Sequence, residues 1–319
     1  MLRLIRRHPR LADLVLAPLI WPCALLLKLV RTAGVQNLPR CKDVLLRIGV
    51  FPVERHYYEP QFDNRDPRPP FHEERDLPAI DWNEAEQLRL LDSFSCEAEL
   101  ADVPQAGGGG LDFHFNNGSF ESGDAEYWYQ LIRSVKPKRI IEIGSGNSTR
   151  MAIRAIRVNR REDSAYQCDH VCVEPYEMAW LDESEARVVR RRVEELDLGF
   201  FSGLGRDDIL FIDSSHMIKP QGDVVFEYLQ LLPSLNPGVI VHVHDIFSPR
   251  NYPREWLADE VKFWNEQYLL EAFLSFNPTW KIVGALNYLH HRHYERLKAK
   301  APFLTPDREP GSFYLRKAG

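Results

Sequence analysis

Two short groups of polar residues follow buried, β-branched runs of the chain and have the composition for acid–base chemistry. His216 comes three residues after Asp213, which closes the run Asp208 to Asp213, and the pair His244-Asp245 closes the run Val239 to Asp245. A histidine titrates near neutral pH and can take a proton from a hydroxyl group. His216 could therefore take such a proton, with the carboxylate of Asp213 three residues before it.

The two carboxylates, Asp213 and Asp245, end what we expect to be adjacent strands about 5 Å apart. Two carboxylates this close repel each other unless a proton, a cation or a cationic ligand lies between them. A divalent metal with oxygen ligands would suit them, so Asp213 and Asp245 are also the candidate metal ligands.

A glycine turn between a predicted strand and a predicted helix is the second chemical feature. Arg139 to Ile143 has the pattern of a buried strand, and Met151 to Val158 has helical spacing. Glycines let the backbone approach a ligand closely, and a helix start offers free N–H groups. The predicted cofactor-binding residues here are Glu142, Gly144, Ser145, Gly146, Asn147 and Ser148.

The sequence of this turn indicates a cationic ligand rather than a phosphate. A dinucleotide-binding turn has the pattern Gly-x-Gly-x-x-Gly, but the third position here is Thr149. Glu142 lies directly before the turn, where its carboxylate would repel a phosphate and attract a positive charge.

Two further acids lie where a nucleoside would bind. Glu174 ends the predicted second strand, Asp169 to Glu174, and an acid at this place in a nucleotide site accepts hydrogen bonds from two ribose hydroxyls. Glu194 belongs to the predicted third strand, Val188 to Leu196, near the adenine edge.

Alternating helices and buried strands must position these groups. Their alternating order predicts a doubly wound, mostly parallel seven-stranded α/β sheet. Ligands bind such sheets at the carboxyl ends of the strands, which is where the candidate residues lie. The remaining predicted helices are Asn83 to Phe94, Ala125 to Val135, Val224 to Leu232 and Glu255 to Phe276, and the remaining predicted strands are Trp280 to Leu286 and Gly311 to Arg316.

We divide the chain into an apolar segment (1–35), an irregular and helical extension (36–110) and a cofactor-binding domain (111–319). The extension contains the aromatic group His56-Tyr57-Tyr58 and a proline-rich, charged stretch from Asp63 to Pro70, which predicts a linker. Gly107 to Gly110 predicts a flexible loop.

The first 31 residues are unusual because arginines flank an uncharged run, Leu14 to Leu27, that Pro18 and Pro22 interrupt. The run is short for a membrane span. Three interpretations remain open: a helix at a membrane surface whose arginines meet anionic lipid, a bent helix that re-enters the bilayer, or an apolar helix packed on protein. No clear cleavage site for a signal peptide follows.

The composition of the chain limits the kinds of binding partner and indicates a cellular compartment. The net charge is −6 and no basic arm is present, which argues against a nucleic-acid partner. The five cysteines form no C-x-x-C pair, which indicates a reducing compartment and no zinc knuckle. We therefore expect a cytoplasmic protein, with the inner face of a membrane as the variant that residues 1–31 suggest.

The motifs Glu142-x-Gly144-x-Gly146, Glu174, Asp213-x-x-His216 and His244-Asp245, each at the end of a successive strand, resemble the class I S-adenosylmethionine-dependent methyltransferases. The chain looks most like the branch of macrocin-type and catechol-type O-methyltransferases. The resemblance begins near Gly123 and leaves about the first hundred residues uncovered.

The resemblance implies an antiparallel last strand, S-adenosylmethionine as cofactor with Glu142 toward its methionine end, and O-methylation of a small molecule. It also implies Mg²⁺ at Asp213 and Asp245, with His216 as base. His244 departs from this pattern because the macrocin-type enzymes tend to have a second acid there, which puts the magnesium in doubt.

Two other functions remain. An NAD(P)-dependent oxidoreductase predicts a glycine at position 149, which is Thr149. A non-catalytic cofactor-binding protein at a membrane predicts a cleft poor in charge. The acceptor is not specified; a sugar or lipid-linked glycan would fit an aromatic pocket beside a membrane-seeking segment. The oligomeric state is not indicated.

Overall fold

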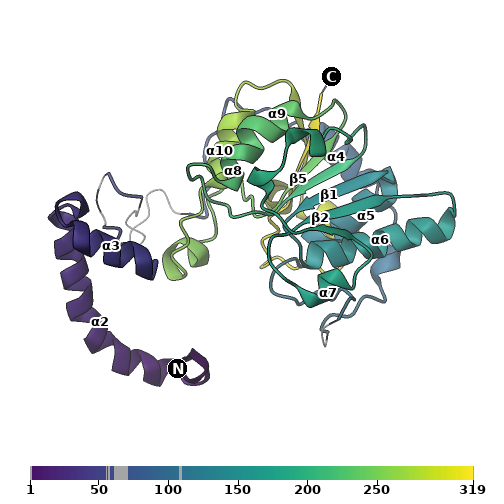
Figure 1. Ribbon diagram of the computed structural model, residues 1–319. Coiled ribbons are helices and arrows are strands. Elements are labelled where there is room, and N and C mark those ends of the chain that lie inside the picture. Colours follow the sequence, from purple (N-terminus) through teal and green to yellow (C-terminus); the bar gives the residue numbers. More distant parts are fainter. Residues whose placement is uncertain (1, 55, 57, 61–70, 108–109, 319) are drawn as a thin grey trace. The chain divides into compact units, whose positions relative to one another are not determined.

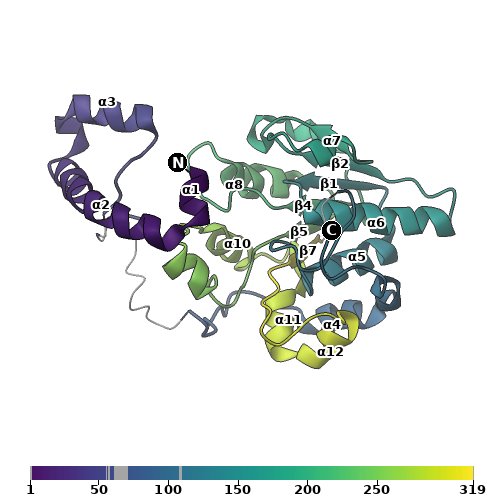
Figure 2. The same cartoon turned by 90° about the horizontal axis from the view of Figure 1, so that it is seen from below.

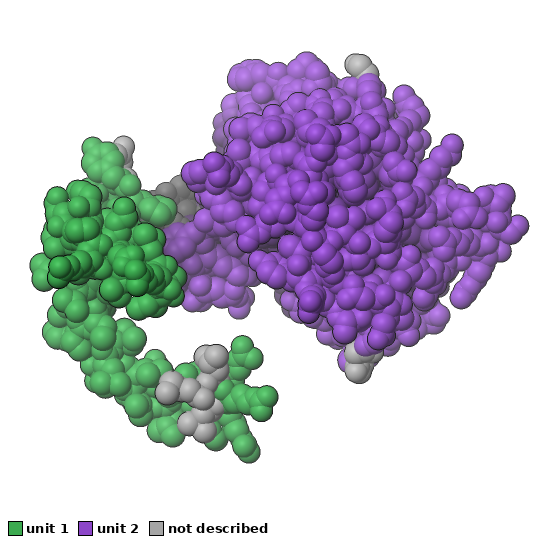
Figure 3. Space-filling model, in the orientation of Figure 1, with its two compact units in different colours: residues 1–67 green, residues 68–319 purple. Residues whose placement is uncertain are grey.

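The computed structural model describes residues 2–54, 56, 58–60, 71–107 and 110–318. The chain forms two compact units, residues 1–67 and 68–319 (Figure 3). The predicted linker from Asp63 to Pro70, Tyr57 in the aromatic group, and the centre of the glycine loop at 108–109 lie outside the described residues.

The unit boundary differs from the predicted division at residue 110. Helix α4 (Glu84–Ser93) belongs to the larger unit, where it contacts β6 (Trp280–Ala285). Asn83 Nδ2 donates to the carbonyl of Ile282 at 2.9 Å, and Gln87 Oε1 accepts from the N–H of Ala285 at 2.7 Å. The segment around α4 is therefore part of the larger unit rather than of a separate extension.

The smaller unit is helical. It contains α1 (Leu2–Arg7), α2 (Pro9–Thr32), a 3₁₀ turn (Val35–Asn37) and α3 (Pro39–Ile48). The predicted interruption at Pro18 and Pro22 is wrong, since α2 continues through both and curves (Figure 1). By length and composition α2 is long and apolar enough to cross a membrane.

The larger unit is built on a seven-stranded sheet of order β3-β2-β1-β4-β5-β7-β6. Strands β1 to β5 are parallel, and β7 lies antiparallel between β5 and β6. The predicted fold, doubly wound and mostly parallel with an antiparallel last strand, is confirmed. The other strands are β1 (Arg139–Ile143), β2 (Asp169–Val173), β3 (Arg187–Val189), β4 (Ile209–Ile212), β5 (Ile240–Val243) and β7 (Phe313–Lys317).

Helices cover both faces of this sheet. Figures 1 and 2 show α8 and α10 on one side and α5 and α6 on the other. The remaining helices and turns are α5 (Asp124–Val135), α6 (Asn147–Glu162), α7 (Ala179–Asp182), α8 (Asp223–Phe226), a π turn (Glu227–Leu231), α9 (Leu232–Ser234), α10 (Glu266–Leu274), α11 (Leu286–Arg292) and α12 (Tyr294–Lys300), with 3₁₀ turns at Glu97–Leu100, Val193–Glu195 and Leu198–Phe200.

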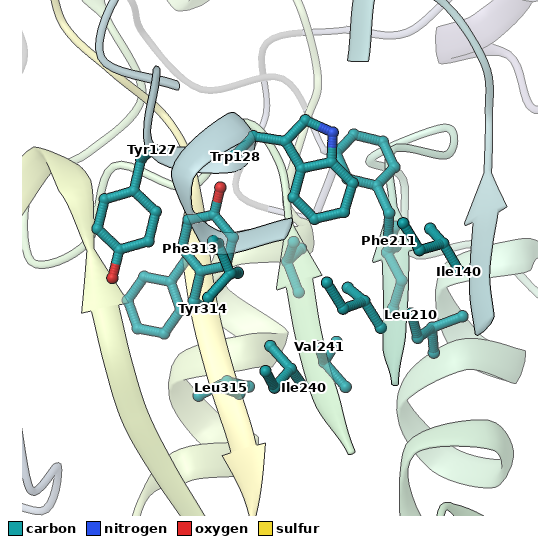
Figure 4. Close-up of a cluster of buried hydrophobic side chains, with 14 of the residues drawn as sticks. Tyr127, Trp128, Ile140, Leu210, Phe211, Ile240, Val241, Phe313, Tyr314 and Leu315 are labelled. Atoms are coloured by element: carbon teal, nitrogen blue, oxygen red, sulfur yellow. The ribbon is translucent and has the colours of Figure 1, made fainter. Parts of the chain in front are cut away.

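The core between α5 and the sheet is rich in aromatic side chains (Figure 4). Trp128 of α5 lies over Phe211 of β4, and Tyr127 stacks on Tyr314 of β7 with ring centroids 4.6 Å apart. His242 of β5 is fully buried, and its Nε2 lies 2.8 Å from Ser312 Oγ. The strand patterns are apolar on both faces because both faces are covered.

Two predicted elements are wrong in extent. The third strand ends at Val189, because the chain then turns through the polar run Arg190 to Arg192 into a 3₁₀ turn. The predicted long helix 255–276 is divided into a π turn (Glu255–Asp259) and α10, with a loop at 260–265 between them. This loop folds back toward His216, whose carbonyl accepts from the N–H of Asn265 at 3.0 Å.

Backbone hydrogen bonds align the carboxyl ends of the central strands. Asp213 N–H donates to Ile143 at 2.9 Å, and His244 N–H donates to Ile212 at 2.9 Å. Gly144 has φ +86°, and a Cβ there would lie 2.2 Å from the Asp213 carbonyl oxygen. Only glycine allows β1 and β4 to end this close together.

Candidate active site

A first cavity of about 460 Å³ opens at the carboxyl ends of β1, β2 and β4. Four of the predicted site residues line it, namely Gly144, Glu174, Glu194 and Asp213. Its position at the strand ends is where a doubly wound sheet binds a nucleoside ligand. The other residues of its wall include Ile143, Val173, Pro175, Tyr176, Arg192, Ser214, Ser215, Lys219 and Gln221.

Glu174 is positioned by its own loop. It is buried, and its Oε1 accepts a hydrogen bond from the Tyr176 N–H at 2.9 Å. This bond fixes the carboxylate at the start of the β2–α7 loop.

The glycine turn differs from the prediction in the direction of Glu142. This side chain is fully buried, and its carboxylate accepts from Ser148 Oγ at 2.9 Å and from Thr149 Oγ1 at 3.0 Å. Its other oxygen pairs with His170 Nε2. Glu142 and Ser148 thus hold the turn from below and do not line the cavity, so the expectation that Glu142 meets the ligand directly does not fit this geometry.

The other turn residues lie around the helix start. Gly146 N–H donates to Thr149 Oγ1 at 3.2 Å, and Asn147 Nδ2 donates to Ser119 Oγ at 2.9 Å, which ties the turn to the loop before α5. Ser145 Oγ is buried and has no hydrogen-bond partner among the described residues. Ser145 therefore keeps free hydrogen-bonding capacity beside the cavity.

The predicted catalytic residues come together in one cluster. His216 Nε2 lies 3.2 Å from Asp213 Oδ1 and 3.5 Å from Asp245 Oδ2. His244 Nδ1 completes the group at 3.6 Å from Asp213 Oδ1 and 3.5 Å from Asp245 Oδ1. Two imidazoles and two carboxylates therefore share one space at the ends of β4 and β5.

Glu266 orients His216. Its Oε2 accepts from His216 Nδ1 at 2.8 Å, and its Oε1 accepts from the Tyr228 hydroxyl at 3.0 Å. The Trp264 ring packs on the His216 ring with centroids 4.3 Å apart. With Nδ1 held by Glu266, Nε2 is the nitrogen that faces the two aspartates.

The backbone at two cluster residues is strained. His216 and Asp245 both have φ +58°, a left-handed conformation that is uncommon for residues other than glycine. Such conformations persist where the surrounding structure fixes them, and they gather at functional sites. Here they aim the two side chains at each other across the ends of β4 and β5.

Burial and neighbouring charge shift the titration of the whole cluster. Burial alone would lower the pKa of His216, but Asp213 and Glu266 raise it well above its ordinary value. Burial likewise opposes a charged His244, yet Asp245 and Asp213 raise its pKa. Burial raises the pKa of Asp245, whereas the two histidines outweigh burial and lower the pKa of Asp213. The two histidines of the cluster therefore hold their protons at neutral pH.

A second cavity, of about 370 Å³, lies on the other side of the cluster. Its wall contains His244 and Asp245 together with loops before α5, after β5 and before β7. Six carboxylates line it, and Trp256 and Phe247 add aromatic surface. The carboxylates are Glu121, Asp124, Asp245, Glu255, Asp307 and Glu309, and Arg308 is held by Glu121 at 2.7 Å.

Three groups of side chains have the composition of a metal site among the described residues: Asp213, His216 and Asp245; Glu142, His170 and Cys172; and His290, His291 and Glu309. In the first group one of the three donors is an imidazole nitrogen. Mg²⁺ prefers an all-oxygen octahedral shell. This donor set therefore does not fit a Mg²⁺ site, and the departure at His244, an imidazole in place of an acid, adds to the misfit.

Several residues of the site were missed by sequence reasoning. Glu266 and Trp264 lie about fifty positions from His216 in the chain, and nothing in their local pattern marks them. Trp256 lies in a segment predicted as helix, and Arg308 lies between the last two predicted strands. Asp124 is the first residue of α5, where an acid is common because it interacts favourably with the helix dipole and so gives no functional signal.

Comparison with known proteins finds similarity for the central part of the larger unit. Residues 141–246 match the family model of a methyltransferase domain. An uncharacterized protein of Archaeoglobus fulgidus is 32% identical over 132 residues, which cover 39% of this chain and 58% of that protein. The chain thus spans a little over half of the length of this relative.

Solved structures with similarity to the chain include two O-methyltransferases. TomG from Streptomyces achromogenes, in complex with SAM, is 15% identical; the alignment covers 77% of this chain and 92% of TomG with a TM-score of 0.36. An enzyme from Bacillus cereus, in complex with SAH, is 13% identical over 75% of this chain and 91% of that chain, with a TM-score of 0.35. The matched methyltransferase domain runs from β1 to just beyond β5 and so contains the glycine turn and the charged cluster.

Proposed function

We propose that this chain, which carries a methyltransferase domain, transfers the methyl group of S-adenosylmethionine to a hydroxyl oxygen. One observation supports this most strongly: Asp213 lines the first cavity, Asp245 lines the second, and His216 Nε2 lies 3.2 and 3.5 Å from them. A nucleoside in the first cavity and an acceptor in the second would meet at these two aspartates, with the buried His216 within 3.5 Å of both carboxylates.

When bound, S-adenosylmethionine supplies an electrophilic methyl group on a positively charged sulfonium. In the first cavity Glu174 would hold the ribose hydroxyls, and Glu194 would lie toward the adenine edge. The carboxylate of Asp213 would face the positive charge. Ser145, with its unpartnered hydroxyl, is a further contact that this turn offers.

His216 would take the proton of the acceptor hydroxyl at Nε2. Glu266 accepts from Nδ1 and so would stabilise the imidazolium that forms, while Asp213 and Asp245 would compensate its charge. Because these carboxylates raise the pKa of His216, the base must first lose a proton. A sulfonium beside Asp213 would lower that pKa and favour the neutral base.

The same nitrogen cannot bind a metal and accept the proton. Since Nδ1 is held by Glu266 and Nε2 faces the aspartates, a metal at Asp213, His216 and Asp245 would remove the base. We therefore propose that the positive charge between the two aspartates is a proton on His216, and that the reaction needs no Mg²⁺.

The acceptor we propose is a small polyhydroxylated molecule such as a sugar, free or in a lipid-linked glycan. Carboxylates accept hydrogen bonds from hydroxyl groups, and aromatic rings such as Trp256 pack on the apolar faces of sugars, and the second cavity offers both. A cytoplasmic location, expected from the scattered cysteines of the sequence, is part of this proposal.

Calorimetry with the full chain tests the cofactor. We expect S-adenosylmethionine and S-adenosylhomocysteine to bind and NADH not to bind. Tight binding of NADH with no binding of S-adenosylmethionine would favour the oxidoreductase. If the cofactor binds but no sugar or glycan acceptor gains the mass of one methyl group, a non-catalytic binding protein becomes the better account.

A further inference from the structure

Helix α2 (Pro9–Thr32) carries its charges in a single row. The helix contains four charged side chains, Arg10, Asp13, Lys28 and Arg31. In an α-helix, successive residues are about 100° apart, so positions separated by three or four lie on one side. The row that joins the four charges continues through Ala17, Trp21 and Ala24.

The rest of the helix surface is apolar. Outside this row only Cys23 and Thr32 have a polar side-chain atom. Leu19, Leu26 and Leu29 lie on the opposite side, each more than half exposed. Among the described residues the helix has no buried side chain, and only Leu27 and Val30 of its large apolar residues are half-buried, so most of this apolar surface has no cover within the part of the chain that the structure describes.

Although α2 as a whole is long and apolar enough to cross a membrane, its uncharged part alone is too short to span the hydrocarbon core. Leu14 to Leu27 is the uncharged part, and at 1.5 Å per residue it is about 21 Å long, whereas the hydrocarbon core is about 30 Å thick. A spanning orientation would place Asp13 or Lys28 in hydrocarbon, where a charge is costly.

Both flanks of the helix are basic, which argues that both ends stay on one side. The preceding residues contain Arg3, Arg6 and Arg7, and the following helix α3 contains Arg40, Lys42 and Arg47. Lysine and arginine near an apolar segment stay on the cytoplasmic side, and they are attracted to anionic headgroups. In the middle of the charged row, Ala17 and Ala24 have small side chains, and Trp21 is of a residue type that is enriched at the headgroup level of membranes.

We propose that α2 lies in the plane of one leaflet of an anionic membrane, with the row from Arg10 to Arg31 toward water and the face with Leu19 and Leu26 in the acyl chains. The proposal commits the helix to a lipid surface and anchors the methyltransferase unit without crossing the bilayer. It does not depend on the proposed reaction, because lipid binding needs neither cofactor nor acceptor.

Two matched double variants of the full chain test the orientation. Leu19→Gln with Leu26→Gln places amides on the apolar face, and Ala17→Gln with Ala24→Gln places the same amides on the charged row, with no change of net charge. Co-sedimentation is measured with vesicles of phosphatidylcholine containing phosphatidylglycerol. We expect the leucine pair to weaken binding by at least about tenfold, since two buried leucines are exchanged for polar groups, and the alanine pair to change it less than about twofold.

The results separate the alternatives. Equal weakening by both pairs would overturn the in-plane orientation, because a spanning or re-entrant helix has lipid on all sides. Absence of wild-type binding, or binding that is unaffected by either pair, would overturn the membrane surface. The intact mass of the protein purified from cells must show that α2 is present, because a segment that is removed in cells cannot hold the mature protein on a membrane. Unchanged binding of S-adenosylhomocysteine by calorimetry checks that the variants are folded.

Discussion

The two cavities beside the charged cluster are built in different ways. The first is walled mainly by residues that directly follow β1, β2 and β4, such as Gly144, Glu174 and Asp213. The second is walled by loops from three distant parts of the chain, including Ser119, Trp256 and Arg308. Residues at strand ends are fixed by the sheet, whereas loop residues depend on long-range contacts.

This difference explains what the sequence could predict. A buried strand leaves a local pattern, and in a parallel sheet its carboxyl end must lie beside those of its neighbours. The cluster of Asp213, His216 and Asp245 could be expected for this reason. The direction of Glu142 could not, because its partner His170 lies 28 positions away on β2.

Loops and connecting helices were predicted less well, because their positions also depend on long-range contacts. Segment 260–265 lies within the aromatic-rich stretch that was predicted as one helix, but Trp264 packs on His216 and the helix begins only at Glu266. A tertiary contact here overrides local propensity. Likewise, α4 was assigned to a separate extension because nothing local marks its hydrogen bonds to β6.

The largest expected effect is that of His216→Ala in the cluster between the two cavities. If His216 is the general base, turnover should fall by about 10² to 10⁴, the usual contribution of such a group. The dissociation constant of S-adenosylhomocysteine should change little, since His216 is not part of the first cavity wall. His293→Ala serves as the control and should keep activity. Normal turnover of His216→Ala would remove the proposed base.

A variant in the first cavity alone should separate cofactor binding from chemistry. Glu174→Ala should weaken binding of S-adenosylmethionine by about 10- to 150-fold, which corresponds to 1.5–3 kcal/mol for hydrogen bonds to a charged group. Turnover at saturating cofactor should be nearly normal. Glu177→Ala, three residues further and exposed, is the matched control. Equal affinities of both variants, measured by calorimetry, would argue against the ribose role of Glu174.

The pH profile tests the positioning of His216 by Glu266. Activity requires neutral His216, whose pKa is raised, so kcat should rise with pH through a limb that lies above the ordinary histidine value. Glu266→Gln removes a negative charge and should move this limb to lower pH, with a maximal kcat roughly tenfold lower because the ring is held less well. A purely structural role would lower activity without moving the limb. Glu295→Gln, at an exposed position of α12, is the control.

Chelation should have the smallest effect. The donor set of the cluster does not suit Mg²⁺, and His216 is required as base, so EDTA should leave the wild-type rate unchanged. Asp245→Asn should still lower the rate, because the imidazolium loses a compensating charge. A rate that disappears with EDTA and returns with Mg²⁺ would show that the aspartates bind a metal.

The central claim, that one cluster serves two cavities, is tested most directly by a crystal structure of the full chain with S-adenosylhomocysteine. We expect the ribose to contact Glu174 and the sulfur to point past Asp213 toward His216 and the cavity lined by Asp245 and Trp256. The nucleoside in any other cavity, or a sulfur directed away from His216, would contradict it.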